Sequence, residues 1–210
     1  MKKAIIFDMD GVLIDSEPFY FERRMDFFRA KGIRPGSDQF DDYVGNSEKQ
    51  TWEVLIPNDE IKREQLRQEY LHYKKQHRID FSKALRDSVP QVLNALTDAG
   101  FSLGLASSSP RSEIDQMLID CQLKNYFSYT ISGEDVRESK PNPEIYLICQ
   151  AKLACDDNLA VEDSTLGIAA AKAAGIYTVA LKQPFQMDQT AADSIINDLN
   201  ELITLPRLAK

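Results

Sequence analysis

A short apolar run near the start of the chain, followed at once by two acids and a glycine, constrains the fold most strongly. Residues Ile5, Ile6 and Phe7 form the run, which predicts a strand buried on both faces, as in a parallel sheet. Asp8 and Asp10 follow, and in an extended chain residues two apart share one face. Such close carboxylates repel each other, so they need a cation or a shared proton. A simple turn at the strand end explains the same residues equally well, because Asp and Gly are common in turns.

Strands and helices alternate through the second part of the chain. Short apolar stretches between turn signals predict strands over residues 101–106, 127–131, 158–161 and 177–181, with a short edge strand over 194–196. Apolar residues at helical spacing predict helices between these strands. This alternation is typical of an α/β fold, in which helices cover both faces of a parallel sheet.

The stretch between the first strand and this alternating part has a different character. No segment of residues 16–83 looks like a buried strand, and apolar residues at helical spacing predict amphipathic helices, with Trp52 as the anchor of their core. We therefore expect an α/β core domain formed by residues 1–15 and 84–210, and an all-α domain, residues 16–83, inserted into it.

Charge and composition restrict the partners. A formal net charge of −8 disfavours nucleic acid and anionic membranes, which attract basic surfaces. No apolar stretch is long enough to span a bilayer, and we expect no signal peptide before the first strand. The three cysteines are scattered without CxxC spacing, which favours buried thiols in a reducing compartment. We expect a cytoplasmic protein without nucleic acid or membrane partners, and a monomer.

Two of the later strands lead into loops with groups suited to an anion. Ser107, Ser108 and Ser109 precede Pro110, and hydroxyl and backbone N–H groups at a helix N-terminus can bind an anion. Ser109 alone is more simply interpreted as a helix N-cap. Lys140 lies in the next such loop, before a helix that Asn142 is expected to cap, and it can neutralise an anion. A lone loop lysine, however, is usually only solvated.

A third strand ends in acids. Glu162 and Asp163 follow the strand over residues 158–161, where they can cap the next helix or supply oxygen ligands to Mg²⁺. Each of these signals is weak alone. Because the carboxyl ends of parallel strands lie at one edge of a sheet, however, we expect all four strand ends to contribute to one pocket.

The order of these groups resembles the haloacid dehalogenase (HAD) superfamily, in the branch with a helical cap inserted after the first motif. The resemblance covers the whole chain and implies a Rossmann-like core with the Asp8 strand at its centre. Within this superfamily, the sequence is similar to the branch that contains β-phosphoglucomutase and sugar-phosphate phosphatases. The segments that carry it are DMDGVLIDSE at residues 8–17, Ser107, SKPNPEIY at 139–146 and VEDSTLGI at 161–168.

The resemblance implies a role for each acid. Asp8 would be the nucleophile that forms an aspartyl-phosphate, and Asp10 would act first as general acid and then as general base. Mg²⁺ would be held by a carboxylate oxygen of Asp8, the backbone carbonyl of Asp10 and Asp163. Glu162 would be a direct or water-mediated ligand.

The resemblance also implies the groups that hold the phosphate. Ser107, the backbone N–H of Ser108 and Lys140 would bind the phosphoryl oxygens, with Lys140 counted among the catalytic residues. Glu17 would contact the leaving group of the substrate, although a solvated loop acid is an equally good interpretation.

Two departures favour a phosphatase over a mutase. The mutase pattern has a His shortly after the first motif, where this chain continues from Glu17 with Pro-Phe-Tyr. It also has a cap Arg three residues past a glycine, which grips a second phosphate. Here Glu48 occupies that position, and a carboxylate repels a phosphate, while its neighbour Lys49 lacks the bidentate fork of arginine.

We therefore predict a Mg²⁺-dependent phosphatase that hydrolyses a small phosphorylated metabolite, with a sugar phosphate as the expected substrate. The alternatives are a phosphosugar mutase of the β-phosphoglucomutase type and a non-enzymatic protein that binds Mg²⁺ and phosphate.

Overall fold

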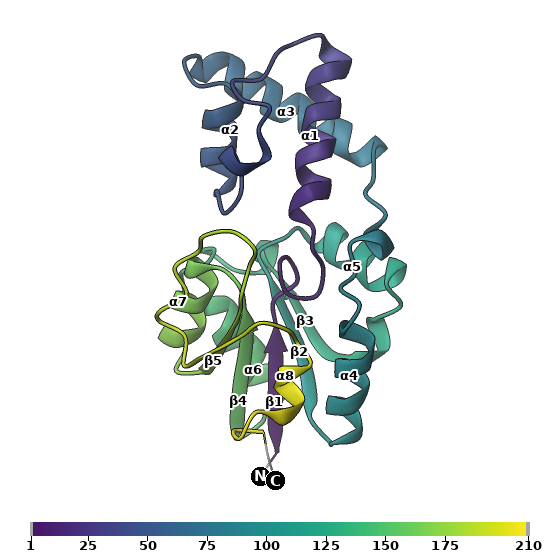
Figure 1. Cartoon of the computed structure of the whole chain (residues 1–210), viewed down its shortest axis with the longest axis vertical. Helices are drawn as coiled ribbons and strands as arrows, with labels where there is room; N and C mark the ends of the chain where they lie inside the picture. The colour runs from purple at the N-terminus through teal and green to yellow at the C-terminus, as the bar shows by residue number, and fades with distance from the viewer. Residues whose placement is uncertain (1, 209–210) are drawn as a thin grey trace. The chain divides into compact units, whose positions relative to one another are not determined.

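The structure is a computed structural model that describes residues 2–208. Six parallel strands form one sheet in the order β3-β2-β1-β4-β5-β6 (Figure 1). The sheet thereby confirms the predicted α/β fold class. The strands are β1 Lys3–Phe7, β2 Ser102–Ser107, β3 Phe127–Ser132, β4 Asp157–Glu162, β5 Tyr177–Leu181 and β6 Ser194–Ile196.

The first strand lies in the middle of the sheet. Ile6 of β1 pairs with Gly104 of β2 on one side and with Ala160 of β4 on the other. The apolar residues of β1 are fully buried, because helices cover both faces of a parallel sheet. Each predicted strand is present. The first begins two residues earlier than the predicted run from Ile5, and the bounds of the others differ from the predicted ones by at most one residue.

Helices cover both faces of the sheet (Figure 1). Side chains of α6 and α7, among them Cys149 and Ala170, pack against Ile6 and Ala106 in one buried cluster. Helices α4 and α8 contact each other on the opposite face, and α5 contacts β3 (Figure 1). The bounds are α4 Val89–Asp98, α5 Arg111–Asp120, α6 Glu144–Leu153, α7 Thr165–Ala173 and α8 Glu201–Thr204.

Residues 16–80 form a second compact unit, in which every regular element is helical. Its core is aromatic: the ring of Trp52 lies 6.3 Å from that of Phe28 and 5.7 Å from that of Tyr70. Trp52 is buried, which confirms it as an anchor of this unit. The α-helices are α1 Glu17–Lys31, α2 Glu48–Leu55 and α3 Glu60–Gln76.

The α/β unit consists of the residues up to 15 and those from 81 onward. The chain therefore returns to it three residues before the expected boundary at 83/84. Phe81 explains the difference, because its buried ring and its backbone belong to the α/β unit. Its N–H donates to Asp120 of α5 at 3.2 Å, and its carbonyl accepts from the Cys121 thiol at 3.4 Å.

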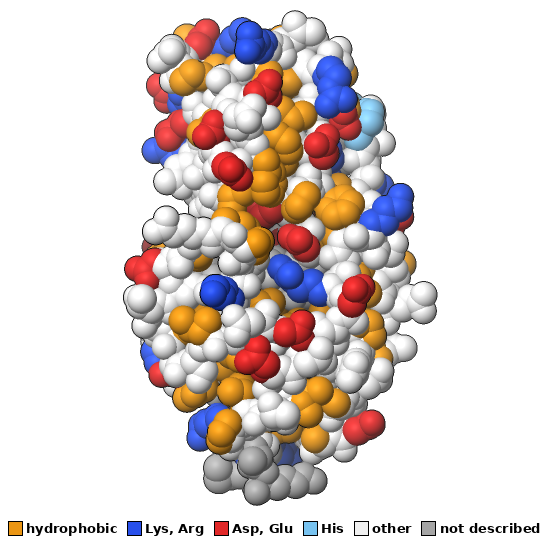
Figure 2. Space-filling model, in the orientation of Figure 1, with side chains coloured by type: hydrophobic (Ala, Val, Ile, Leu, Met, Phe, Trp, Pro, Cys, Tyr) orange, Lys and Arg blue, Asp and Glu red, His pale blue; other side chains and the backbone are white. Residues whose placement is uncertain are grey.

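Charged side chains are mixed on the face drawn in Figure 2, where acidic and basic groups alternate rather than gather by sign. Across residues 2–208, no helix combines the length and the apolar character needed to cross a membrane.

Candidate active site

The site begins where the chain turns sharply after β1. The N–H groups of Leu13 and Ile14 both donate to the carbonyl of Met9, at 2.9 and 3.2 Å. Gly11 has a φ of 75°, which only glycine adopts without strain. A Cβ at Gly11 would lie 2.0 Å from a carboxylate oxygen of Asp163. The turn after β1 therefore packs directly against the turn after β4.

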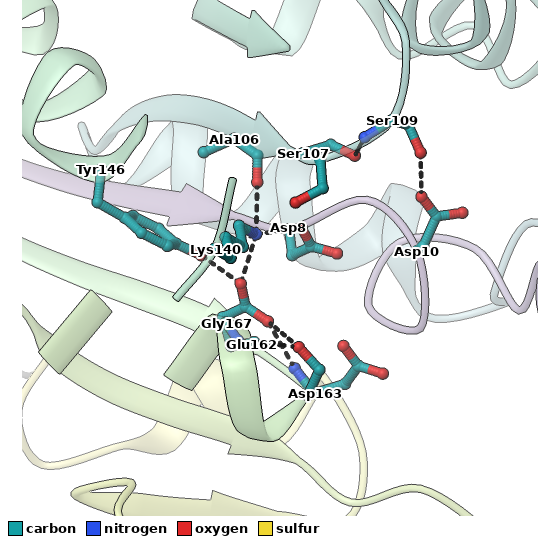
Figure 3. Close-up of polar contacts among 12 residues, drawn as sticks. Asp8, Asp10, Ala106, Ser107, Ser109, Lys140, Tyr146, Glu162, Asp163 and Gly167 are labelled. Carbon is teal, nitrogen blue, oxygen red and sulfur yellow. Dashed lines mark hydrogen bonds and ion pairs between the residues drawn. The ribbon is translucent and has the colours of Figure 1, made fainter. Parts of the chain in front are cut away.

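Lys140 lies between two carboxylates. Its Nζ is 2.6 Å from Oδ1 of Asp8 and 2.6 Å from Oε1 of Glu162, and it donates to the carbonyl of Ala106 at 3.0 Å (Figure 3). The side chain is only 6% exposed. Burial opposes its charge, but Asp8 and Glu162 together raise the pKa of Lys140 above its usual value. Lys140 is thus a buried ammonium that links three strand ends.

Glu162 is fully buried and uses both of its oxygens. Oε1 accepts from Lys140 and from the hydroxyl of Tyr146, each at 2.6 Å, and Oε2 accepts from the N–H of Asp163 at 3.2 Å. A Cβ at Gly167 would lie 2.1 Å from this carboxylate, so the glycine of α7 makes room for it. These contacts suit Glu162 to holding Lys140 and the Asp163 turn in place. Tyr146 was not identified from the sequence, although it lies within the SKPNPEIY segment.

Three acids gather where a cation is needed. Asp8, Glu162 and Asp163 each offer an oxygen within 4.8 Å of the others. Burial raises the pKa of Asp8 to about 8, and Lys140 offsets this only in part. Burial also raises the pKa of Asp163 well above its usual value, and repulsion from Glu162 and Asp8 adds to the effect. When all three are ionised, three carboxylates and one ammonium leave two unbalanced negative charges, which a divalent cation offsets. Because Mg²⁺ prefers oxygen ligands, the residues present fit the predicted ion.

Asp10 is paired with a serine that the sequence analysis interpreted as a helix cap. The hydroxyl of Ser109 donates to Oδ2 of Asp10 at 2.7 Å (Figure 3). Helix α5 begins at Arg111 and has Pro110 as its N-cap, so the interpretation of Ser109 as N-cap is wrong. Its hydroxyl instead fixes the carboxylate assigned to acid–base catalysis. The only sequence signal for this role is the position of Ser109 two residues after Ser107.

The predicted phosphate-binding serines lie at the same edge of the sheet. Ser107 ends β2 and is buried, and its Oγ accepts from the N–H of Ser109 at 3.1 Å. A Cβ at Gly133 would lie 2.6 Å from the carbonyl of Ser108, so the loop after β3 packs against this turn. In the loop that carries Lys140, the N-cap of α6 is Pro143 rather than the expected Asn142.

The remaining predicted residues belong to the helical unit. Glu17 is the first residue of α1, and its contact with a leaving group stays a prediction. Glu48 and Lys49 begin α2, where Glu48 lies 3.6 Å from Arg67 and Lys49 is largely exposed. Glu48 therefore already has a cationic neighbour on α3.

Comparison with known proteins agrees with this arrangement. The family described as haloacid dehalogenase-like hydrolase matches residues 5–181. A phosphorylated carbohydrates phosphatase of Thermotoga maritima is 34% identical over 181 residues, which cover 84% of this chain and 83% of the relative. Hexitol phosphatase B of Escherichia coli K12 is 30% identical over an alignment of 211 positions, which covers 95% of this chain and 93% of the relative.

A solved structure has the same fold. A Thermotoga maritima protein, provisionally named as a β-phosphoglucomutase, superposes with a TM-score of 0.78 and is 30% identical, with 97% of each chain covered. Similar proteins thus have both phosphatase and mutase names.

Proposed function

Because the chain belongs to the haloacid dehalogenase-like hydrolases, we propose that it hydrolyses a small phosphorylated sugar or polyol through an aspartyl-phosphate on Asp8. The two relatives described above are named phosphatases, which supports phosphatase activity for this chain. The observation that carries the proposed mechanism is the sharing of Lys140 by Asp8 and Glu162, with both oxygens 2.6 Å from Nζ. A buried ammonium in contact with the nucleophile also attracts the negatively charged ester to it.

The reaction proceeds in two displacements. A carboxylate oxygen of Asp8 attacks phosphorus, the bond from phosphorus to the ester oxygen breaks, and Asp10 donates a proton to the leaving alcohol. Water then attacks the aspartyl-phosphate, gives a proton to Asp10 and releases inorganic phosphate, which regenerates Asp8. Ser109 supports this role because its hydroxyl holds the Asp10 carboxylate at 2.7 Å.

The cofactor in this proposal is Mg²⁺, held by Asp8, Asp163 and the backbone carbonyl of Asp10. When bound, it offsets the negative charge that otherwise keeps a carboxylate and a phosphate ester apart. Glu162 contributes indirectly, because its oxygens already accept from Lys140, Tyr146 and the Asp163 N–H. Ser107, the N–H of Ser108 and Lys140 hold the phosphoryl oxygens.

One observation supports the substrate class, and another supports hydrolysis over phosphoryl transfer within the sugar. The relatives cited above are named for phosphorylated carbohydrates and for hexitols, both small polyhydroxylated phosphates. Glu48, where a mutase has arginine, supports hydrolysis rather than transfer between two positions of one sugar, because its carboxylate would repel a second phosphate.

Phosphate release from a panel of substrates tests the proposal. The panel contains hexose and hexitol phosphates, phosphoglycolate and nucleoside monophosphates, each with Mg²⁺ and with a chelator. We expect release from the sugar or hexitol phosphates only when Mg²⁺ is present. Conversion of β-glucose 1-phosphate to glucose 6-phosphate without net release would support the mutase instead. No turnover of any substrate would support the binding protein.

The covalent step has its own test. The leaving group of p-nitrophenyl phosphate needs no proton, so Asp10→Asn should still transfer its phosphoryl group to Asp8 but should hydrolyse the intermediate slowly. Mass spectrometry should then detect one phosphoryl group on the peptide that contains Asp8. Rapid turnover without a phosphorylated protein would argue against Asp8 as nucleophile.

A further inference from the structure

Two buried glutamines lie behind the candidate site, in the segment between β5 and β6. Gln183 and Gln189 are each 6% exposed. Their Nε2 atoms both donate to the carbonyl of Leu181, the last residue of β5, at 3.3 and 2.8 Å. Both amides are therefore anchored to the same point of the sheet.

Each glutamine also contacts a different turn of the site. Nε2 of Gln183 donates to the carbonyl of Gly11 at 2.9 Å, and Nε2 of Gln189 donates to the carbonyl of Asp163 at 2.5 Å. Arg86 strengthens the first contact, because its Nη2 donates to Gly11 at 3.0 Å and to Oε1 of Gln183 at 3.2 Å. The turns after β1 and β4 are thus both tied to the end of β5.

The two turns need such a tie because their carboxylates repel each other when both are ionised. Asp8 and Asp163 have carboxylate oxygens within 4.8 Å of each other, and the turns touch where a Cβ at Gly11 would lie 2.0 Å from Asp163. A small separation of the turns would relieve the repulsion and would also spread the oxygens. Hydrogen bonds to the backbone carbonyls of both turns oppose that separation without changing any carboxylate.

We propose that Gln183 and Gln189 are positioning residues for Mg²⁺ binding, which fix the Asp8–Gly11 turn and the Glu162–Asp163 turn at the spacing that one cation needs. The inference rests on the proposed function, since it requires the metal site assigned there. Neither glutamine touches the reacting atoms. They act on the carboxylates through the backbone.

Calorimetric titration of the full chain with MgCl₂ tests this proposal. Gln183→Met and Gln189→Met keep the length and the apolar volume of the side chain but remove the amide donor. We expect each to weaken Mg²⁺ binding about 10- to 100-fold, the usual effect of removing groups that orient metal ligands. Gln91→Met, at an exposed position of α4, is the matched control and should bind Mg²⁺ like the unmodified protein.

Two further measurements separate positioning from a purely structural role. The increase in melting temperature on adding Mg²⁺ should shrink in both variants, whereas a purely structural glutamine would lower the melting temperature equally with and without the ion. The kcat of each variant should also recover at saturating Mg²⁺, because the groups that perform the chemistry are intact. If Gln189→Met does not fold, Gln183→Met alone tests the proposal, because the Gln183 amide holds the other turn through the Gly11 carbonyl.

Unchanged Mg²⁺ affinity in the folded variants would overturn this inference alone. An unmodified protein that does not bind Mg²⁺ would overturn the proposed metal site and the inference with it.

Discussion

Beside their apolar cores, the two units of the chain bury different kinds of side chain. In the α/β unit, buried charges meet at the strand ends, with Lys140 between Asp8 and Glu162. The buried cluster of the helical unit is aromatic and aliphatic, and in it Trp52 packs against Phe28 and Tyr70. Buried charges require fixed partners, whereas aromatic packing tolerates many arrangements of similar volume. The difference teaches that the proposed chemistry belongs to the unit whose buried charges each depend on a fixed partner.

The same difference explains why the reaction is easier to infer than the substrate. The residues of the α/β unit that carry chemistry occupy positions set by strand register, and their types follow from the reaction. The core residues of the helical unit need only fill its interior with apolar side chains of suitable volume, so their types carry no information about the substrate. Its surface positions, such as Glu48 and Lys49, have no comparable constraint.

The largest expected effect is the loss of the nucleophile. Asp8→Asn should lower turnover at least about 10⁴-fold, the scale of removing a reacting side chain. The fold should remain, because the change removes one of three mutually repelling carboxylates. Phosphate release and urea unfolding measure the two effects. As a control, Asp41→Asn changes an exposed acid of the helical unit and should leave turnover unchanged. Appreciable residual activity in Asp8→Asn would contradict its role.

The next effect tests whether the helical unit depends on packing alone. Leu55→Ala removes a fully buried side chain and should destabilise this unit by about 2–5 kcal/mol. Trp52 is the only tryptophan in the chain, so its fluorescence reports unfolding of the helical unit. The urea midpoint measured by fluorescence should fall, while Mg²⁺ affinity should not change. Ile61→Ala, at an exposed position, should shift neither. A parallel loss of Mg²⁺ affinity in Leu55→Ala would break the proposed separation of roles.

A smaller effect should appear in the pH dependence of stability. Burial raises the pKa of Asp8 to about 8, from 3.8 for the unperturbed group, so between these values the folded protein holds a proton that the unfolded chain has released. Stability without metal is therefore greatest below about pH 4 for this group and falls as pH rises towards 8, by at most about 1.4 kcal/mol per pH unit. Urea unfolding at pH 5 and pH 8 measures the decline.

Added Mg²⁺ should reduce that decline, because bound metal favours the ionised carboxylates. Metal-free Asp8→Asn should show a weaker pH dependence than the unmodified protein. A stability that stays constant from pH 5 to pH 8 without metal would show that the buried acids are already ionised there.

The smallest effect concerns the hydroxyl that holds Asp10. Ser109→Ala removes a hydrogen bond worth about 1 kcal/mol, which corresponds to roughly a fivefold fall in kcat. Substrates whose leaving group needs no proton should be affected less in the first step. Ser109→Thr keeps the hydroxyl and is the matched control. An equal loss of activity in Ser109→Thr would point to a packing effect at this position instead.

Much of the fold and part of the site could be predicted from local sequence. Strands buried on both faces are continuous apolar runs, so their bounds lie within two residues of the predicted ones. The residues brought together at the strand ends could be predicted because acids, serines and a lysine follow those apolar runs. The roles of Gln183 and Gln189 could not be predicted in this way, because nothing in the sequence near a loop glutamine indicates that its amide will donate to a distant backbone carbonyl. The prediction of Ser109 as a helix N-cap was wrong for a related reason. Its hydroxyl donates to Asp10, which is distant in the sequence, and does not cap the helix that follows it.

The central position of β1 has a consequence for synthesis on the ribosome. Ala4 pairs with Ser102 and with Asn158, so β1 leaves the ribosome well before either of its neighbours, and β4 follows only after most of the residues described here. The helical unit, residues 16–80, has been translated in full long before that. Nascent chains that contain residues 16–80 but not β4 would therefore have an ordered helical unit and an exposed apolar strand, a target for chaperones.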